Sequence, residues 1–318
     1  MRVSKNLAYG LIALAAVLWA TNGIFSTLTY DEGASVMQVT VIATALTGLV
    51  LVLLIAPLDP KSLRIKREDF LPFLGFSLIT GTFFALAWYA CLERTGVATA
   101  VILLYIYPSI VTLASVFLLG EKLTAPKAIA LPLTFIGCVL VAGAQEFEQG
   151  LSFDTIGILF GLFTALAGAV YYLWGKKFLD TYSANTVILY MTILSLPGLF
   201  VLGAAADWLS TSPESNLFDI HISGYGWAYM LAIAIFPGTI AFVASMVALK
   251  HLEASKASIV ASVEPVAAVV IAWLVLTETI NGLQALGVVL VFVGVILLRL
   301  TTEKLQSEGP PEAVVLER

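Results

Sequence analysis

Residues 255–277 read SKASIVASVEPVAAVVIAWLVLT. The run is long enough to cross a bilayer, because a helix needs about 20 mainly apolar residues to span roughly 30 Å of hydrocarbon. Glu264 lies about 13 Å from Ser255 at 1.5 Å per residue, close to the middle of such a span. The segment therefore predicts a transmembrane helix that carries one costly ionisable group near its centre.

Nine further runs of similar length lie along the chain, so we expect an all-α membrane protein with ten transmembrane helices. Of the 318 residues, 60% are hydrophobic and 12% are charged, whereas about a quarter are charged in soluble domains. This composition excludes an ordinary globular enzyme, a nucleic-acid-binding protein and a disordered chain. The expected spans are 7–30, 36–56, 70–91, 97–119, 125–144, 155–174, 184–204, 225–248, 255–277 and 281–300.

The positions of lysine and arginine predict the orientation of these spans. If the amino terminus lies inside, fifteen of the sixteen basic residues fall in inner segments and only Arg94 falls in an outer loop. Basic residues favour the cytoplasmic side. We therefore expect a multi-pass protein of the plasma (inner) membrane with both termini in the cytoplasm.

The first half of the chain matches the second at a constant offset of 157 residues from the third expected span onward, and the first expected span of each half matches at an offset of 152, as at Gly23 and Gly175. Five helices make an odd number, so the second copy enters the membrane from the opposite side, which is typical of secondary transporters. We expect one repeat over residues 1–146, a second over 150–302 and a disordered cytoplasmic tail over 303–318. The most informative matches are Gly81 with Gly238, Thr82 with Thr239, Pro108 with Pro265, Glu121 with Glu278 and Gly137 with Gly294.

Three motifs resemble the EamA type of the drug/metabolite transporter superfamily. They are LWATN at 18–22, GVATA at 96–100 with YP at 107–108 and LGEKLT at 119–124, and VEPV at 263–266 with LTETI at 276–280. The resemblance covers nearly the whole chain, although Thr277 stands where the family usually has glycine. It implies a central cavity lined by spans 1, 3, 4, 6, 8 and 9, with spans 5 and 10 peripheral. Members of the family move amino acids, nucleosides, vitamins or drugs, commonly outward.

Glu264 is the candidate coupling residue, because no lysine or arginine lies deep enough in a span to pair with it. It could bind a proton or an ammonium group. It could equally have a structural role, because Pro265 clashes with the carbonyl of Ala261, and a protonated Glu264 could satisfy a freed carbonyl. The repeat partner of Glu264 is Tyr107, and Pro108 and Pro265 are the candidate hinges.

Candidate substrate-binding residues are polar or aromatic positions within the spans. Trp19, Asn22 and Ser26 form one helical stripe, which could line a cavity or join two helices. Packing or an interfacial aromatic belt competes with substrate binding at the others, which are Trp88, Tyr107, Tyr171, Ser245 and Ser262. We expect Glu121 and Glu278 to share a structural role, such as capping the helix that follows each of them.

No metal or cofactor site is expected. Cys91 and Cys138 both lie in apolar runs, His221 and His251 fall on opposite sides of the membrane, and no phosphate-binding glycine loop occurs. An intramembrane enzyme, which would need clustered catalytic groups, is therefore a weak alternative.

The expected function is secondary active transport by alternating access. The absence of deep basic residues favours zwitterionic or cationic amphipathic substrates, with amino acid export first and protons as the candidate coupling ion. An uptake permease or facilitator for a nucleoside-like or vitamin-like solute is the alternative. The expected partners are a small-molecule substrate and the lipid bilayer, without nucleic acid, and no oligomeric state follows from these patterns.

Overall fold

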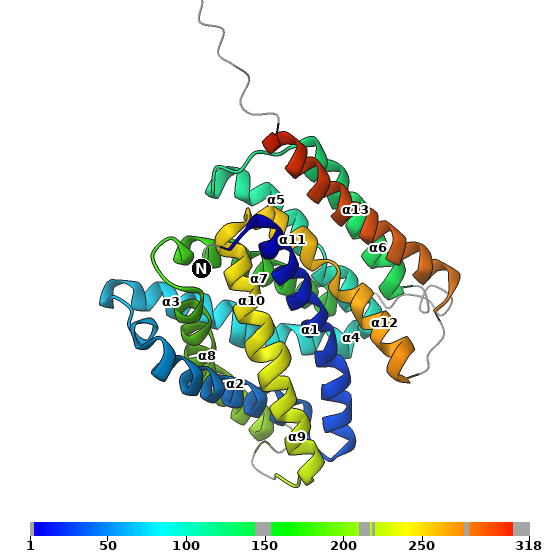
Figure 1. Ribbon diagram of the computed structural model, residues 1–318. Coiled ribbons are helices and arrows are strands. Elements are labelled where there is room, and N and C mark those ends of the chain that lie inside the picture. The colour runs from blue at the N-terminus through cyan, green and yellow to red at the C-terminus, as the bar shows by residue number, and fades with distance from the viewer. Residues whose placement is uncertain (1–2, 144–153, 210–216, 218–219, 277–279, 308–318) are drawn as a thin grey trace, which may run out of the picture.

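A computed structural model describes residues 3–143, 154–209, 217, 220–276 and 280–307. Within these ranges the chain is helical and contains no strand. Figure 1 shows the helices packed side by side, with α6 and α13 forming a pair along one edge of the bundle. Residues 277–279, which include Glu278, lie outside the described ranges.

The helices follow one another with short connections. In chain order they are α1 (Lys5–Asp31), α2 (Val36–Leu58), η1 (Pro60–Leu63), η2 (Arg67–Asp69), α3 (Phe70–Ser77), η3 (Leu78–Phe83), α4 (Phe84–Leu104), α5 (Tyr107–Leu118), α6 (Ala125–Gly143), α7 (Thr155–Leu179), α8 (Ala184–Leu209), α9 (Gly224–Ile233), η5 (Ala234–Ala241), α10 (Phe242–His251), α11 (Ala254–Ala261), α12 (Glu264–Leu276) and α13 (Gly282–Ser307). The last helix passes residue 302, where we expected the second repeat to end, and residues 308–318 of the expected tail lie outside the described ranges.

Nine helical runs in the described ranges are long and apolar enough to cross a membrane. Eight of them correspond to single expected spans, whereas Arg67–Leu118 takes in both 70–91 and 97–119. Gly96 interrupts this 52-residue run with φ 80° and ψ 170°, a positive φ that glycine adopts without steric cost. The protein is therefore an all-α, multi-pass membrane protein.

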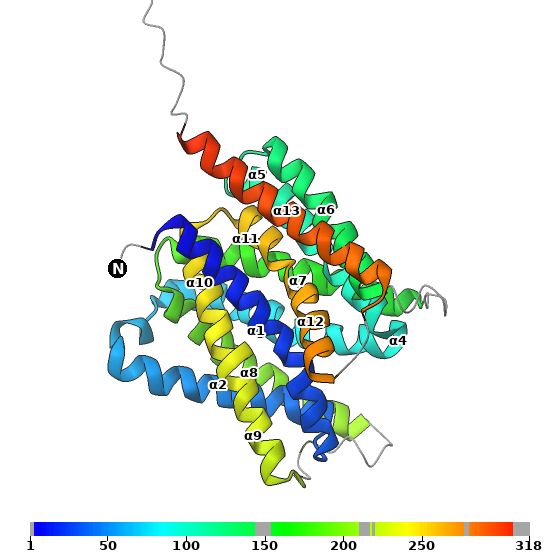
Figure 2. The ribbon, with the colours of Figure 1, turned by 45° about the vertical axis from the view of Figure 1, so that its right-hand side comes forward.

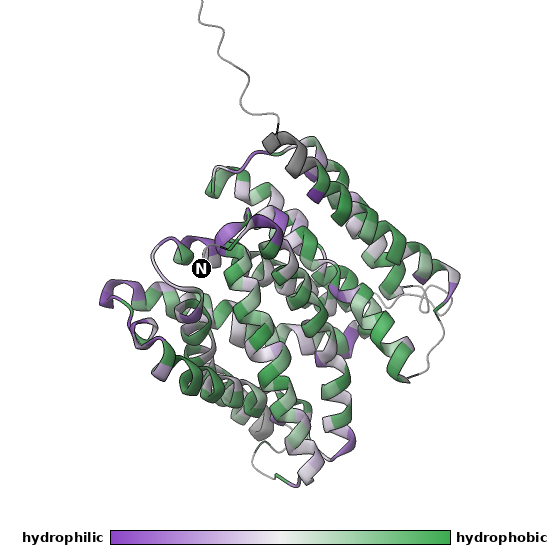
Figure 3. Cartoon of the chain, viewed as in Figure 1, coloured by the Kyte–Doolittle hydropathy of each residue, from purple (hydrophilic) through white to green (hydrophobic). Residues whose placement is uncertain are grey.

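The outward faces of the helices are apolar. Phe117 is 86% exposed and Leu58 is 80% exposed. Figure 3 shows hydrophilic residues gathered at helix ends and connections, while the flanks of the helices are hydrophobic. Since lipid tails rather than water surround a spanning helix, these exposed side chains form the surface that faces the membrane.

Local capping fixes where several helices begin. At the start of α2, the Gln38 amide donates to Ser35 Oγ at 3.2 Å and the Ser35 amide donates to Gln38 Oε1 at 2.9 Å, which is a capping box. Asp154 accepts from the Gly157 amide at 2.6 Å at the start of α7. These bonds satisfy amide groups that have no partner within the first turn of a helix.

Two π-helical segments, η3 and η5, occupy positions that match at the 157-residue offset. Each contains one glycine against the other half of the chain. A Cβ on Gly81 would lie 2.5 Å from Ser195 Cβ, and a Cβ on Gly238 would overlap Thr47 Oγ1. Each π-helical segment therefore approaches the second long helix of the opposite half closely.

The helices of one half pack mainly against those of the other. α1 runs along α9, η5 and α10, while α7 runs along α4, and α2 packs on α8. α6 and α13 lie side by side in both views (Figures 1 and 2). This arrangement places the interior of the protein between the two halves.

Candidate functional site

A cavity of about 400 Å³ lies among helices from both halves. It is lined by parts of α1, α2, η3, α4, α7, α8, α9, η5 and α10, together with Tyr107 at the start of α5 and Glu264 at the start of α12. α6 and α13 contribute none of its lining residues, as the resemblance implied for spans 5 and 10.

Seven of the nine residues expected to bind substrate or couple transport line this one cavity. The other two, Ser245 and Ser262, are buried beside it: Ser245 Oγ accepts from the Tyr171 hydroxyl at 3.1 Å, and the Ser262 carbonyl accepts from Cys138 Sγ at 3.6 Å. Both residues are therefore buried and are not among the lining residues. The seven lining residues are Trp19, Asn22, Ser26, Trp88, Tyr107, Tyr171 and Glu264.

α2 and α8 also line the cavity, although the resemblance did not imply a lining role for them. α2 presents Thr40, Thr44 and Thr47, each of which donates its hydroxyl proton to a carbonyl one turn earlier. α8 presents Thr192 and Ser195. The threonines follow the i, i+4, i+7 spacing of one helix face, so the periodicity of residues 40–47 was a usable signal.

The helices that carry Tyr107 and Glu264 are interrupted at equivalent positions. α4 ends at Leu104 and α5 begins at Tyr107, while α11 ends at Ala261 and α12 begins at Glu264. Pro108 and Pro265 are each the second residue of the new helix, where the missing amide proton has no helical partner to lose. Both interruptions therefore place residue 107 or 264 in a first helical turn beside the cavity.

Among the described residues that line the cavity, Glu264 is the one acidic or basic residue. The Tyr105 hydroxyl donates a hydrogen bond to its carboxylate. In the described ranges, no three His, Cys, Asp or Glu side chains meet as a site that could hold a metal ion. The cavity thus combines a single carboxylate with otherwise neutral walls.

Aromatic rings cover much of the wall near Glu264. Trp19 meets the rings of Phe242 and Tyr171 edge-on, with centroids 5.3 Å and 6.3 Å away. Tyr107 stacks on Tyr172 with centroids 5.5 Å apart, and Tyr172 meets Tyr171 edge-on at 5.2 Å. A cation bound here would lie near the electron-rich faces of several rings.

Two hydrogen-bond donors on α1 have no partner in the part of the chain that the structure describes. Trp19 Nε1 is buried and makes no hydrogen bond to any described residue. The side chain of Asn22, one turn further along α1, is exposed and also makes none within the described ranges. A buried N–H without an acceptor costs free energy, so the pair is suited to a solute that brings its own oxygen atoms.

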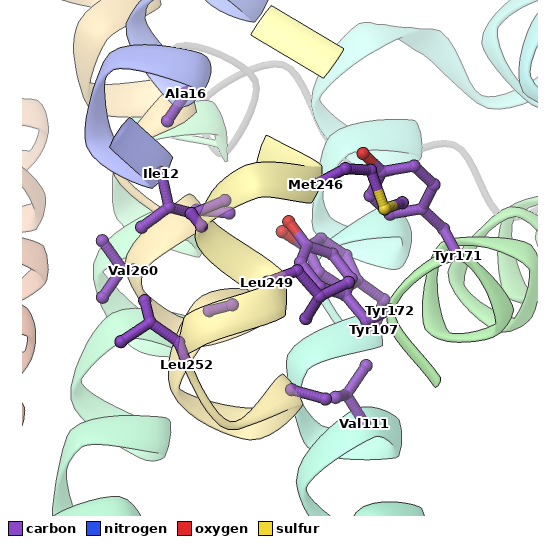
Figure 4. Packing of buried hydrophobic residues seen from close by; sticks show 14 of the residues in the cluster. Ile12, Ala16, Tyr107, Val111, Tyr171, Tyr172, Met246, Leu249, Leu252 and Val260 are labelled. Atoms are coloured by element: carbon purple, nitrogen blue, oxygen red, sulfur yellow. The ribbon is translucent and has the colours of Figure 1, made fainter. Parts of the chain in front are cut away.

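A second cavity, of about 690 Å³, lies at the Lys5 end of α1 and includes Tyr9, Lys176 and Glu253 in its wall. Between the two cavities, Ile12 and Ala16 of α1 are fully buried. Figure 4 shows them beside Leu249, Leu252 and Val260, with the rings of Tyr107, Tyr171 and Tyr172 nearby. A packed apolar layer therefore separates the central cavity from the Lys5 side of the protein.

One family model, that of the EamA-like transporter family, matches the chain twice, over residues 6–143 and 155–300. The chain belongs to the EamA-like transporter family. This EamA-like transporter is 26% identical over 300 residues to an uncharacterised transporter of Archaeoglobus fulgidus, an alignment that covers 92% of this chain and 97% of the relative. It is 24% identical over 299 residues to the uncharacterised inner membrane transporter YicL of Salmonella typhimurium, covering 92% and 95%.

The fold of this EamA-like transporter is also found among solved structures. A crystal structure with 19% sequence identity superposes with a TM-score of 0.79, covering 95% of this chain and 100% of that chain. At this identity the likeness concerns the fold alone.

Proposed function

We propose that this EamA-like transporter exports amino acids or similar zwitterionic or cationic amphipathic solutes by alternating access, with Glu264 as the coupling residue. The observation that carries the proposal is the pairing of one carboxylate with unpartnered donors in a single cavity. Glu264 would bind the ammonium group of the substrate, while Trp19 Nε1 and the Asn22 amide would donate hydrogen bonds to the carboxylate of the substrate. The aromatic rings would cover an apolar side chain.

Proton coupling follows from competition at Glu264. A carboxyl group in this cavity can hold either a proton or a substrate cation, and binding one opposes binding the other. When the two are exchanged on opposite sides of the membrane, the proton gradient drives the substrate outward. The apolar layer around Ile12 and Ala16 supports alternating access. It closes the central cavity toward the Lys5 side, as expected of one of the two states of such a transporter.

Purified protein in liposomes tests this proposal. The wild type should accumulate labelled amino acids against a gradient when a pH difference is imposed. Glu264→Gln keeps the shape of the side chain but cannot release a proton, so it should retain substrate exchange and lose accumulation. Glu93→Gln, which removes an exposed carboxylate three residues before Gly96 in α4, is the matched control. Full pH-driven accumulation by Glu264→Gln would leave the glutamate with only its helix-break role.

Orientation is part of the proposal, with both termini in the cytoplasm. The run Arg67–Leu118 would cross the membrane twice, once on each side of the interruption at Gly96, which makes ten crossings in all. Asp31, the last residue of α1, and Lys61, which follows α2, are both exposed. In intact cells, an impermeant thiol reagent should label Asp31→Cys and spare Lys61→Cys. The reverse pattern would invert the proposed direction of export.

The alternative is an uptake permease or facilitator for a nucleoside-like or vitamin-like solute. The stacked rings of Tyr107 and Tyr172 favour it, because they could accept a planar heterocycle. Flux of labelled nucleosides down their gradient, unaffected by Glu264→Gln, would support this function and contradict the first.

A further inference from the structure

The Lys5 side of the protein contains a network of charges between the two halves, in which Lys127 and Glu121 are buried and Glu253 is partly exposed. Lys127, near the start of α6, is 1% exposed. Its ammonium group lies 3.2 Å from Glu121 Oε2, 2.5 Å from Glu253 Oε2 and 3.0 Å from the carbonyl of Lys122. Glu121 and Lys127 belong to the first half of the chain, and Glu253 immediately precedes α11 in the second.

Glu121 caps a helix of the opposite half, rather than the helix that follows it as we expected. Its carboxylate accepts from the amide of Ala254 at 2.6 Å and from the amide of Ser255 at 3.3 Å, and it also accepts from the Ser255 hydroxyl. The side chain of Glu253, the residue before α11, does not cap that helix. The first turn of α11 therefore depends on a residue from the first half.

Such a network is a poor source of stability but a good switch. Removing two ionised groups from water costs several kcal/mol, which their attraction only partly returns, and a role in fixing one arrangement over another is the best-attested use of buried ion pairs. Val260 of the apolar layer also lies on α11, in the turn that follows the one capped by Glu121. Separating α11 from Glu121 and Lys127 would loosen this layer.

We propose that Glu121, Lys127 and Glu253 form a latch that holds the Lys5 side of the transporter closed and must part for that side to open. The proposal rests on the alternating access proposed above and adds the residues that control one of its two states. At the other end of the helices, Arg94 and Asp154 form an ion pair at 3.5 Å whose side chains are 44% and 37% exposed. Exposed pairs contribute little. On the Lys5 side Glu253 is also 42% exposed, but Lys127 and Glu121 are only 1% and 7% exposed, so the two sides of the protein are closed unequally.

The test measures access to the apolar layer and needs no substrate. Ile12 is fully buried and lies one turn beyond Tyr9, which lines the second cavity, so Ile12→Cys reports opening of the Lys5 side. The full-length protein in detergent would be treated with a small maleimide, with the native sequence as background because Cys91 and Cys138 are buried. Labelling should accelerate about tenfold in Glu121→Gln, which corresponds to about 1.4 kcal/mol of lost closure.

Two further variants keep the result decisive. Glu253→Gln removes the partner of Lys127 on the second half but leaves the cap of α11 intact, so it should also accelerate labelling even if Glu121→Gln fails to fold. Glu68→Gln removes an exposed carboxylate that pairs with Lys66 at 3.4 Å and should change nothing. Equal labelling rates in the parent, Glu253→Gln and any folded Glu121→Gln would overturn the latch. Accelerated labelling without amino acid flux would retain the latch and contradict the proposed substrate.

Discussion

The interruption before Tyr107 and the interruption before Glu264 share a backbone but differ in chemistry. Both helices stop for two residues, restart at residues related by the 157-residue offset, and place a proline second in the new helix. One restart presents a phenol stacked on Tyr172, and the other presents a carboxylate that accepts from Tyr105. The two halves therefore share a helix interruption beside the cavity, but Glu264 alone of the two restart residues is a carboxylate.

The largest expected effect comes from making the two restarts chemically alike. Tyr107 is 6% exposed and packed between other tyrosines, so Tyr107→Glu would bury a carboxyl group without a basic partner. We expect it to lower the free energy of unfolding by about 3–5 kcal/mol, as when a buried pair loses one partner. Thermal unfolding in detergent measures this.

Tyr107→Phe is the control for that substitution. The Tyr107 hydroxyl donates to the Ser258 carbonyl at 3.5 Å, a long bond, so its loss should cost only about 0.5 kcal/mol. If Tyr107→Glu were as stable as Tyr107→Phe, the two interruptions would be interchangeable and the contrast between them would disappear.

The π-helical segments test whether symmetry extends to packing. Gly81→Ala and Gly238→Ala each place a methyl group against the opposite half, so both should destabilise the protein by about 1–3 kcal/mol. Gly23→Ala on α1 meets nothing within 4 Å and should be neutral or slightly stabilising. Unfolding temperatures of the three variants make the comparison, and a loss confined to one π-helical segment would show that the halves pack differently.

Trp19 and Tyr171 occupy matching positions in the first helix of each half, at an offset of 152 residues. Tyr171 donates to Ser245 Oγ, whereas Trp19 Nε1 has no acceptor among the described residues. Trp19→Phe should weaken substrate binding by about 1–2 kcal/mol, a factor of roughly 5–30. Tyr171→Phe should have a smaller effect on binding. Substrate affinity from flux measurements distinguishes them, and equal losses would argue against Trp19 as a donor to the substrate.

The smallest expected effect concerns pH and Glu253, which lies outside the membrane-spanning helices. Burial raises the pKa of this carboxyl, but Lys127 and Lys256 outweigh burial and hold the pKa below its ordinary value of 4.5. Glu121 and Lys176 are the other charged groups nearby. The contribution of Glu253 to stability is therefore complete above about pH 4.5 and is lost as the pH falls further.

Comparing the free energy of unfolding of the wild type with that of Glu253→Gln across pH isolates the contribution of the Glu253 charge. The wild type should be more stable by about 0.5–1 kcal/mol from pH 5.5 to 8, since Glu253 is partly exposed. The difference should vanish at the acid end of the titration. A difference that changes near neutral pH would assign the titration to another group.

Sequence patterns predicted what depends on neighbouring residues along the chain. The paired prolines indicated both interruptions, and the stripe of Trp19, Asn22 and Ser26 indicated a face of α1 that lines the cavity. Glu121 was misjudged because its amide partners lie 133 and 134 residues away, which no local capping rule can detect. The cavity wall on α2 was missed because threonines that bond to their own helix look like ordinary packing residues.

The crossing of α6 and α13 bears on how such a chain could arise. A Cβ on Gly137 would lie 2.8 Å from the Gly287 carbonyl, and one on Gly294 would lie 3.1 Å from the Ala130 carbonyl. Shifting either pair by 157 residues and exchanging its members produces the other, so the seam repeats itself about a two-fold axis. A half-length ancestor with this seam would pair with a second copy of itself, and fusion of two such genes would inherit a working junction.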